Sequence, residues 1–193
     1  DQYPDPESTR NRDDTSFADG GRVPRMRPSP SKRSRPDDPA KNWTPGRRRM
    51  LVERFRTVPY PNWLGLKLAK LSAGQADLSL VISKQHQQYR GIAHGGALAS
   101  LADTAATFAV LTIIPNETDV VTIEFKVNFL ASMTGGAAIA RGSVVRVGSR
   151  VAVSDVRVYG PKKDRLVMTG TFTMLVFPKP GDLTGPSANR NDQ

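Results

Sequence analysis

One carboxylate, Asp103, lies in the middle of a long segment of small and apolar side chains. The segment runs from residue 91 to residue 114 (GIAHGGALASLADTAATFAVLTII) and contains one other ionisable side chain, that of His94. A carboxylate in apolar surroundings is poorly solvated, which costs free energy or raises its pKa. A poorly solvated carboxylate is also a good general base or nucleophile. Asp103 is therefore the leading candidate for a catalytic residue.

The residues around Asp103 predict a long buried helix that begins near the turn formed by His94, Gly95 and Gly96. Asp103 follows His94 by nine residues, so at about 1.5 Å of rise per residue it lies in the interior of that helix. Apolar residues occupy nearly all faces of the helix, which predicts burial on all sides. A membrane span is not expected, because the segment is rich in Ala, Gly, Ser and Thr and carries Asp103 at its centre.

The composition is that of one folded domain with unpacked ends. The 193 residues include no cysteine and two histidines, which excludes disulfides and a cysteine nucleophile and argues against a metal site. The lack of cysteine fits a reducing compartment, and we expect a cytoplasmic protein. The first residues contain no apolar run, so no signal peptide is predicted.

The charge and proline content divide the chain into three regions. Residues 1–43 are Pro-rich and charged and predict a disordered tail, residues 44–178 are expected to form the domain, and residues 179–193 predict a flexible tail. The net charge is +10, and nearly all of the excess lies beyond residue 45. Charged runs such as residues 22–35 are usually solvated, so nucleic acid is not expected as a partner.

The hydrophobic pattern predicts an α+β fold. A helix is expected after Thr44 and Pro45, with Met50, Leu51 and Phe55 at helical spacing, and it should end at Pro59. Strands are expected over residues 64–71, 76–83, 120–130, 137–147, 150–159 and 166–177. Short glycine-containing turns join the last three, which predicts an antiparallel meander. The order predicts a curved antiparallel sheet of five to six strands wrapped around the long helix, with a second copy covering the helix at the open sheet edge.

The spacing of the polar and glycine residues near the long helix is also informative. The stretch QYRGIAHGG begins at Gln88 and is followed by Asp103 and Thr107. This pattern resembles the hot-dog-fold acyl-CoA thioesterases, most closely the phenylacetate-pathway and 4-hydroxybenzoyl-CoA types, over roughly residues 46–178. The resemblance implies hydrolysis of an acyl-CoA thioester without a cofactor or metal. It also implies a homodimer or a dimer of dimers, with active sites at the interface and no membrane partner.

The resemblance assigns catalytic roles to six residues. The backbone N–H of Gly95 would polarise the thioester carbonyl, and Asp103 would act either as general base on water or as a nucleophile that forms an anhydride. Gln88 would assist the carbonyl or the water, and Thr107 would position the water. The remaining two are Thr122, which matches a hydroxyl in some members, and His94, which we interpret as stabilising the turn rather than shuttling a proton.

Substrate contacts are expected at the glycine turn and at two basic loops. Gly96 lies at the turn, Arg146 and Arg150 flank one loop, and Lys162 and Lys163 lie in the other. Such cations suit the phosphates of coenzyme A. The candidates for lining an aromatic or medium aliphatic acyl pocket are Ala97, Leu101, Phe108, Phe125, Phe129 and Met133.

Of two other functions, the first fits the same residues and the second is disfavoured. The fold could serve as a non-catalytic acyl-CoA-binding or sensing module, which would bind acyl-CoA without releasing thiol. A hot-dog hydratase would need a catalytic histidine paired with an acid, and this chain offers only His86 and His94. The acyl group and the choice between dimer and tetramer stay open at this point.

Overall fold

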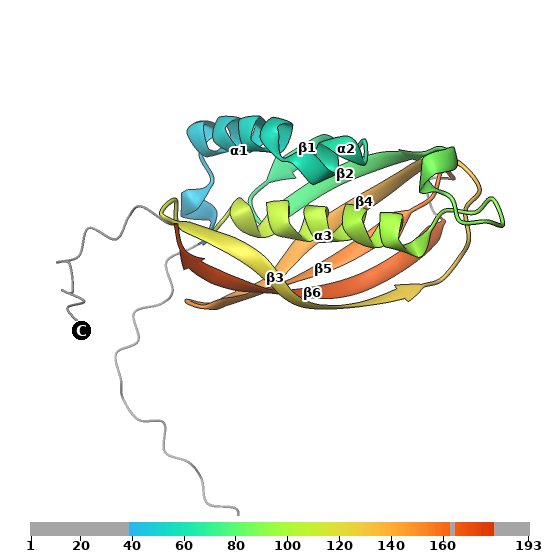
Figure 1. Ribbon diagram of the computed structural model, residues 1–193. Helices are drawn as coiled ribbons and strands as arrows, with labels where there is room; N and C mark the ends of the chain where they lie inside the picture. Colours follow the sequence, from blue (N-terminus) through green and yellow to red (C-terminus); the bar gives the residue numbers. More distant parts are fainter. Residues whose placement is uncertain (1–38, 163–164, 180–193) are drawn as a thin grey trace, which may run out of the picture. The chain divides into compact units, whose positions relative to one another are not determined.

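The computed structural model describes residues 39–162 and 165–179 (Figure 1). Most of the two predicted tails lies outside the described residues. Residues 39–43 were predicted to belong to the N-terminal tail, but Pro39–Asn42 forms a 3-10 helix, η1. The Asn42 side chain donates a 2.7 Å hydrogen bond to the carbonyl of Ile113. The packed part of the chain therefore begins earlier than predicted.

Six strands form one antiparallel sheet in the order β1-β2-β4-β5-β6-β3. The strands are β1 (Lys67–Ser72), β2 (Gln75–Ile82), β3 (Thr118–Phe129), β4 (Gly136–Val147), β5 (Val151–Tyr159) and β6 (Leu166–Pro178). The predicted meander is confirmed as β4-β5-β6. The first strand starts three residues later than predicted, because Leu66 N–H instead bonds back to the carbonyl of Pro61 at the end of a helical turn.

Helix α3 (Gly95–Leu111) lies along one face of this sheet, as Figure 1 shows. Strand side chains that face it are buried, including Leu78 and Leu80 of β2. The helix approaches β4 very closely, since a Cβ on Gly142 would lie 2.6 Å from the carbonyl oxygen of Ala105. Only glycine allows that approach.

Helix α3 is buried along most of its surface, and the face that was expected to be covered by a second copy stays partly exposed in the single chain. A set of small and polar residues at helical spacing keeps part of its surface exposed; we call this set the open stripe. It consists of Gly96, Ala99, Ser100, Asp103, Thr104 and Thr107. The stripe marks the face of α3 that the rest of the chain covers only in part, with Thr122 of β3 contacting Asp103 and Tyr60 contacting Ser100.

Helix α1 (Pro45–Thr57) begins as predicted, with Thr44 as the N-cap that accepts a hydrogen bond from Arg47 N–H at 3.1 Å. Its buried face includes Leu51, as predicted, but Arg47 and not Met50 completes it. Arg47 is 4% exposed, and its Nε donates a 2.9 Å hydrogen bond to the carbonyl of Leu111 at the end of α3. Burial lowers the pKa of Arg47.

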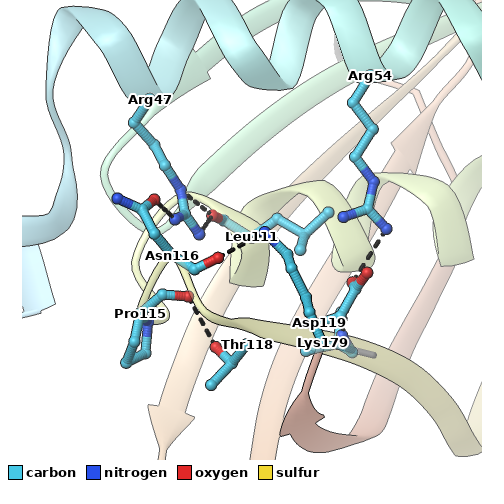
Figure 2. Close-up of polar contacts among 9 residues, drawn as sticks. Arg47, Arg54, Leu111, Pro115, Asn116, Thr118, Asp119 and Lys179 are labelled. Carbon is cyan, nitrogen blue, oxygen red and sulfur yellow. Dashed lines mark hydrogen bonds and ion pairs between the residues drawn. The ribbon is translucent and has the colours of Figure 1, made fainter. Parts of the chain in front are cut away.

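Further polar contacts hold α1 to the chain between α3 and β3 (Figure 2). Arg47 also bonds the side chain of Asn116, and Arg54 forms a 3.0 Å ion pair with Asp119 at the start of β3. A second short helix that was not predicted, α2 (Pro59–Trp63), follows α1 directly. These contacts fix the position of both ends of the α3–β3 connection.

Among the residues that the structure describes, no helix combines the length and apolar character that a membrane span requires.

Candidate functional site

The start of α3 leaves one backbone donor free. His94 is the N-cap residue, with extended backbone angles of φ −67° and ψ 132°, and its Nδ1 accepts a 2.9 Å hydrogen bond from Gly96 N–H. Ala97 N–H bonds to the carbonyl of His94 at 3.0 Å. The N–H of Gly95 has no hydrogen-bond partner within the part of the chain that the structure describes. A free N–H at the positive end of a helix dipole is a ready site for an anionic oxygen.

This arrangement distinguishes the three residues of the predicted turn. Gly96 was expected to contact substrate, but its N–H is occupied by His94. The His94 ring nitrogen Nδ1 is in turn engaged as an acceptor, which is the geometry that a turn-stabilising role requires. Gly95 alone offers an unoccupied amide.

The loop before α3 is held in place by backbone hydrogen bonds from both sides. His94 N–H donates to the carbonyl of His86 in η2 (Lys84–His86) at 2.7 Å, and Ala93 N–H donates to the carbonyl of Met133 at 2.7 Å. Within the loop, Oε1 of Gln88 accepts a 3.0 Å hydrogen bond from Arg90 N–H. The residues that follow β3 therefore lie beside the start of α3.

A cavity of about 470 Å³ opens between this loop and the segment that follows β3. It is lined by Gln88, Ile92, Ala93, His94, Gly95, Leu98, Phe129, Leu130, Ala131, Ser132 and Met133. The lining is mostly apolar with a few polar groups, which is typical of small-molecule sites. The free amide of Gly95 thus belongs to a residue of the cavity wall.

Asp103 lies on the open stripe, in the interior of α3, and is half-buried. Its Oδ1 accepts a 2.7 Å hydrogen bond from the hydroxyl of Thr122 on β3. Burial raises the pKa of Asp103, and the hydrogen bond from Thr122 acts in the opposite direction. Two of the predicted site residues are therefore brought into direct contact. Thr107 lies one turn further along the same stripe.

Gly95 and Asp103 are not brought together within one chain. Asp103 follows Gly95 by eight positions on one helix, which corresponds to about 12 Å along its axis. The carbonyl oxygen of a substrate bound at Gly95 N–H lies about 3 Å from that nitrogen. Asp103 of the same chain is too far away to act on that carbonyl.

The two basic loops lie at opposite ends of the sheet. The turn that carries Arg146 and Arg150 is at the end where α3 stops, since Val144 N–H bonds to the carbonyl of Gly74, and Gly74 packs beside Ile113. Lys162 is at the other end, where α3 begins, because the neighbouring Pro161 packs against Gly136 at the start of β4. Lys163 lies outside the described residues.

The six candidates for an acyl pocket divide into two groups. Phe129 and Met133 line the cavity. The others do not: Ala97, Leu101 and Phe108 belong to the buried core, and Phe125 stacks on Phe172 with ring centroids 5.2 Å apart.

Gln88, His94 and Gly95 were also predicted as site residues, whereas the remaining lining residues were not predicted from the sequence. Residues 130–132 follow a strand, have no periodic pattern and reach the start of α3 only through the fold. Ile92 and Ala93 could have been predicted to line the site, because they directly precede the glycine turn in the sequence.

Comparison with known proteins supports the resemblance to thioesterases that the sequence motif indicates. Residues 90–167 match the family model described as the thioesterase superfamily. A candidate esterase of Halobacterium salinarum is 35% identical over 105 residues, covering 52% of this chain and 69% of that protein. A second candidate esterase, from Saccharolobus solfataricus, is 34% identical over 98 residues, covering 51% of this chain and 65% of the relative. The chain therefore spans just under two thirds of the length of that second relative.

Solved structures share the arrangement of sheet and helix. A thioesterase family protein from Silicibacter pomeroyi superposes with a TM-score of 0.66 at 26% identity, covering 69% of this chain and 100% of that one. A mutant of a phenylacetic acid degradation protein from Thermus thermophilus gives a TM-score of 0.56 at 29% identity, covering 61% of this chain and 98% of that one. The sheet order, the enclosed helix and these similarities confirm the predicted family: the chain belongs to the thioesterase superfamily and has the hot-dog fold.

Proposed function

We propose that this protein hydrolyses acyl-CoA thioesters to a free acid and coenzyme A. The observation that carries the proposal is the presence of two complementary groups on one helix of a thioesterase-superfamily fold. One is the free N–H of Gly95 in a cavity wall, and the other is the half-buried carboxylate of Asp103. The first group suits a developing oxyanion, and the second suits the activation of water or direct attack.

Gly95 N–H would stabilise the carbonyl oxygen as it becomes negative. The N–H lies at the N-terminus of a 17-residue helix, where the helix dipole adds to the hydrogen bond. Removing one such donor from an oxyanion site typically lowers the rate by about 10²–10³. The apolar cavity wall would strengthen this interaction by excluding water.

One carboxylate oxygen of Asp103 accepts a hydrogen bond, and the other is available to react. Oδ1 accepts from Thr122, while Oδ2 has no hydrogen bond within residues 39–162 and 165–179. As general base, Asp103 takes a proton from water while the water oxygen bonds to the carbonyl carbon, and the proton then passes to the departing thiolate. As nucleophile, Oδ2 displaces the thiolate to form an anhydride, which water then hydrolyses. Both routes fit this geometry.

A complete site requires Gly95 from one copy and Asp103 from another, because about 12 Å separates them along one helix. A two-fold axis near the middle of the Gly95-to-Asp103 span would place two α3 helices side by side and antiparallel. Each Gly95 would then face Asp103 of the partner copy. We therefore propose a homodimer with two sites.

The sheet edges favour β3 as the pairing strand. β3 is a 12-residue edge strand, and its Ile123 is 56% exposed. The opposite edge, β1, has six residues. Both edge strands contain a bulge, between Leu68 and Lys70 in β1 and between Thr122 and Glu124 in β3, and both carry exposed lysines. The two edges therefore differ mainly in length, and the longer edge offers more unpaired backbone groups to a second copy.

This dimer would bring both basic loops to the same site. The end of one copy where α3 begins would lie beside the end of the partner where α3 stops. Lys162 of one copy and Arg146 and Arg150 of the other would then flank one cavity opening. We propose these loops as the contacts for the coenzyme A phosphates.

Thiol release from a panel of acyl-CoA thioesters tests the proposed activity. The panel contains acetyl, butyryl, octanoyl, palmitoyl and phenylacetyl thioesters, each assayed with the wild type and with Asp103→Asn. Steady thiol release is expected from the wild type, with a decrease of about 10²-fold or more in the variant. Binding of acyl-CoA without thiol release over hours would instead establish a non-catalytic binding module.

A further inference from the structure

The Phe129 side chain lies directly against Gly95. A Cβ built on Gly95 would be 2.9 Å from Cζ of Phe129 and 3.3 Å from both of its Cε atoms. The tip of the ring therefore packs over the residue whose N–H is free. Both residues also line the same cavity.

The ring lies on the side from which a substrate would approach. In an α-helix the Cα–Cβ bonds tilt toward the N-terminus, and the free N–H groups of the first turn point the same way. The ring occupies the space along the Cβ direction of Gly95. It is therefore beside the position that a bound carbonyl group would take.

Bond lengths place the acyl chain within reach of this ring. A carbonyl oxygen bound to Gly95 N–H lies about 2.9 Å from the nitrogen. The carbonyl carbon is about 1.2 Å beyond that oxygen, and the next acyl carbon is about 1.5 Å further. A substituent on that next carbon would consequently compete with Phe129 for space.

The backbone holds Phe129 in place while much of its side chain stays accessible. Phe129 is the last residue of β3, where it pairs with Met168, and Leu130 N–H bonds to the carbonyl of Val167 at 2.8 Å. The residue is nevertheless 53% exposed. A fixed and exposed phenyl ring beside the free amide is suited to act as a wall of the acyl site.

We propose that Phe129 determines acyl selectivity by admitting acyl groups that are unbranched next to the thioester carbonyl and excluding those that are branched there. This inference rests on the proposed thioester hydrolysis. One methyl group that a pocket accepts or rejects is worth about 10- to 200-fold in kcat/KM. The discrimination between two isomers that differ only in branching should fall in that range.

The test compares butyryl-CoA with its isomer isobutyryl-CoA, which is branched at the carbon next to the carbonyl. The ratio of their kcat/KM values is measured for the wild type, Phe129→Ala and Phe129→Leu, with thermal melting as a check on folding. The wild type should favour butyryl-CoA by about tenfold or more, and Phe129→Ala should remove most of this preference. Phe129→Leu keeps an apolar side chain at the position and should relax the preference in part.

Phe125→Ala is the matched control. Phe125 has the same side chain on the same strand and is 46% exposed, but it stacks on Phe172 and does not line the cavity. Its substitution should leave the ratio unchanged. A second substrate pair, pentanoyl-CoA and 3-methylbutanoyl-CoA, moves the branch one carbon away and should show a smaller wild-type preference.

The outcomes separate this inference from the proposed function. Turnover by the wild type with the same isomer ratio in Phe129→Ala and Phe129→Leu would overturn the inference alone. An equal decrease in kcat/KM for every acyl group would also overturn it, because the ring would then contact the part that all substrates share. Absence of turnover with every thioester would overturn the proposed function, and this inference with it.

Discussion

Thr122 donates a 2.7 Å hydrogen bond to Oδ1 of Asp103, joining β3 to the middle of α3. Two effects therefore act on one carboxylate. Burial disfavours its charged form and raises its pKa, whereas the hydroxyl stabilises the charged form and lowers it. The same bond leaves Oδ2 as the oxygen that is available to react. In the proposed mechanism Thr122 both orients Asp103 and adjusts its basicity.

Replacing Thr122 by Val should move the acid limb of kcat/KM to higher pH. The substitution removes the hydrogen bond that lowers the pKa of Asp103 and leaves the burial that raises it. The measurement is a pH–rate profile of thioester hydrolysis between about pH 4 and pH 9. Thr122→Ser retains the hydroxyl and should keep the wild-type limb. An identical limb in the Val variant would show that this contact does not tune the reacting group.

Replacing Asp103 by Asn should stabilise the fold at neutral pH. Because the pKa of Asp103 is raised in the folded state, the folded chain binds this proton more tightly than the unfolded chain. Its contribution to stability is thus present at low pH and is lost as pH rises from about 3.9 through the folded pKa. Melting temperatures should favour the variant at pH 7 and converge near pH 3. A variant that melts below the wild type at pH 7 would contradict this reasoning.

The sequence allowed the local features of this site to be predicted, and the fold supplied the contacts between distant segments. Alternation in residues 76–82 and the turn formed by residues 94–96 are local signals, and the strand and the helix that they predict formed where expected. The contact between Phe129 and Gly95 joins residues 34 positions apart, through a strand that ends beside a helix start. The burial of Arg47 has no local signal in the sequence, because its partner, the carbonyl of Leu111, is 64 residues away. Such contacts depend on tertiary packing and leave no periodic pattern in the sequence.

Two substitutions of Gly95 should distinguish the contribution of its N–H to activity from the contribution of its missing side chain. Gly95→Pro removes the N–H at the first position of α3, where proline is favoured, and the extended backbone of His94 is compatible with a following proline. We expect a decrease in kcat of about 10²-fold or more.

Gly95→Ala keeps the N–H but pushes the Phe129 ring away. Adding Phe129→Ala to Gly95→Ala should restore part of the activity and should not rescue Gly95→Pro. Equal activity of the Pro and Ala variants would remove the oxyanion role.

Mixing two inactive variants should restore activity if each site draws on two copies. A dimer of one Asp103→Asn copy and one Gly95→Pro copy contains one site with both groups intact and one site with neither. After unfolding and refolding together in equal amounts, about half of the dimers should be mixed, giving about a quarter of the wild-type activity. Each variant refolded alone serves as the control. A mixture no more active than its components would show that the two groups act within one chain.

A charge on the β3 edge should abolish activity by separating the copies. Ile123 is exposed on the long edge strand beside Thr122. Lysine there would place a charge within the proposed interface of both copies, and charged edges block strand pairing. Ile123→Lys should therefore elute as a monomer in size-exclusion chromatography with light scattering, keep its circular dichroism spectrum and lose thioester hydrolysis. Ala69→Lys provides the matched control, because Ala69 is exposed on the opposite edge strand, β1, and should leave both the dimer and its activity intact. A monomeric Ile123→Lys variant with full activity would exclude a site shared between copies.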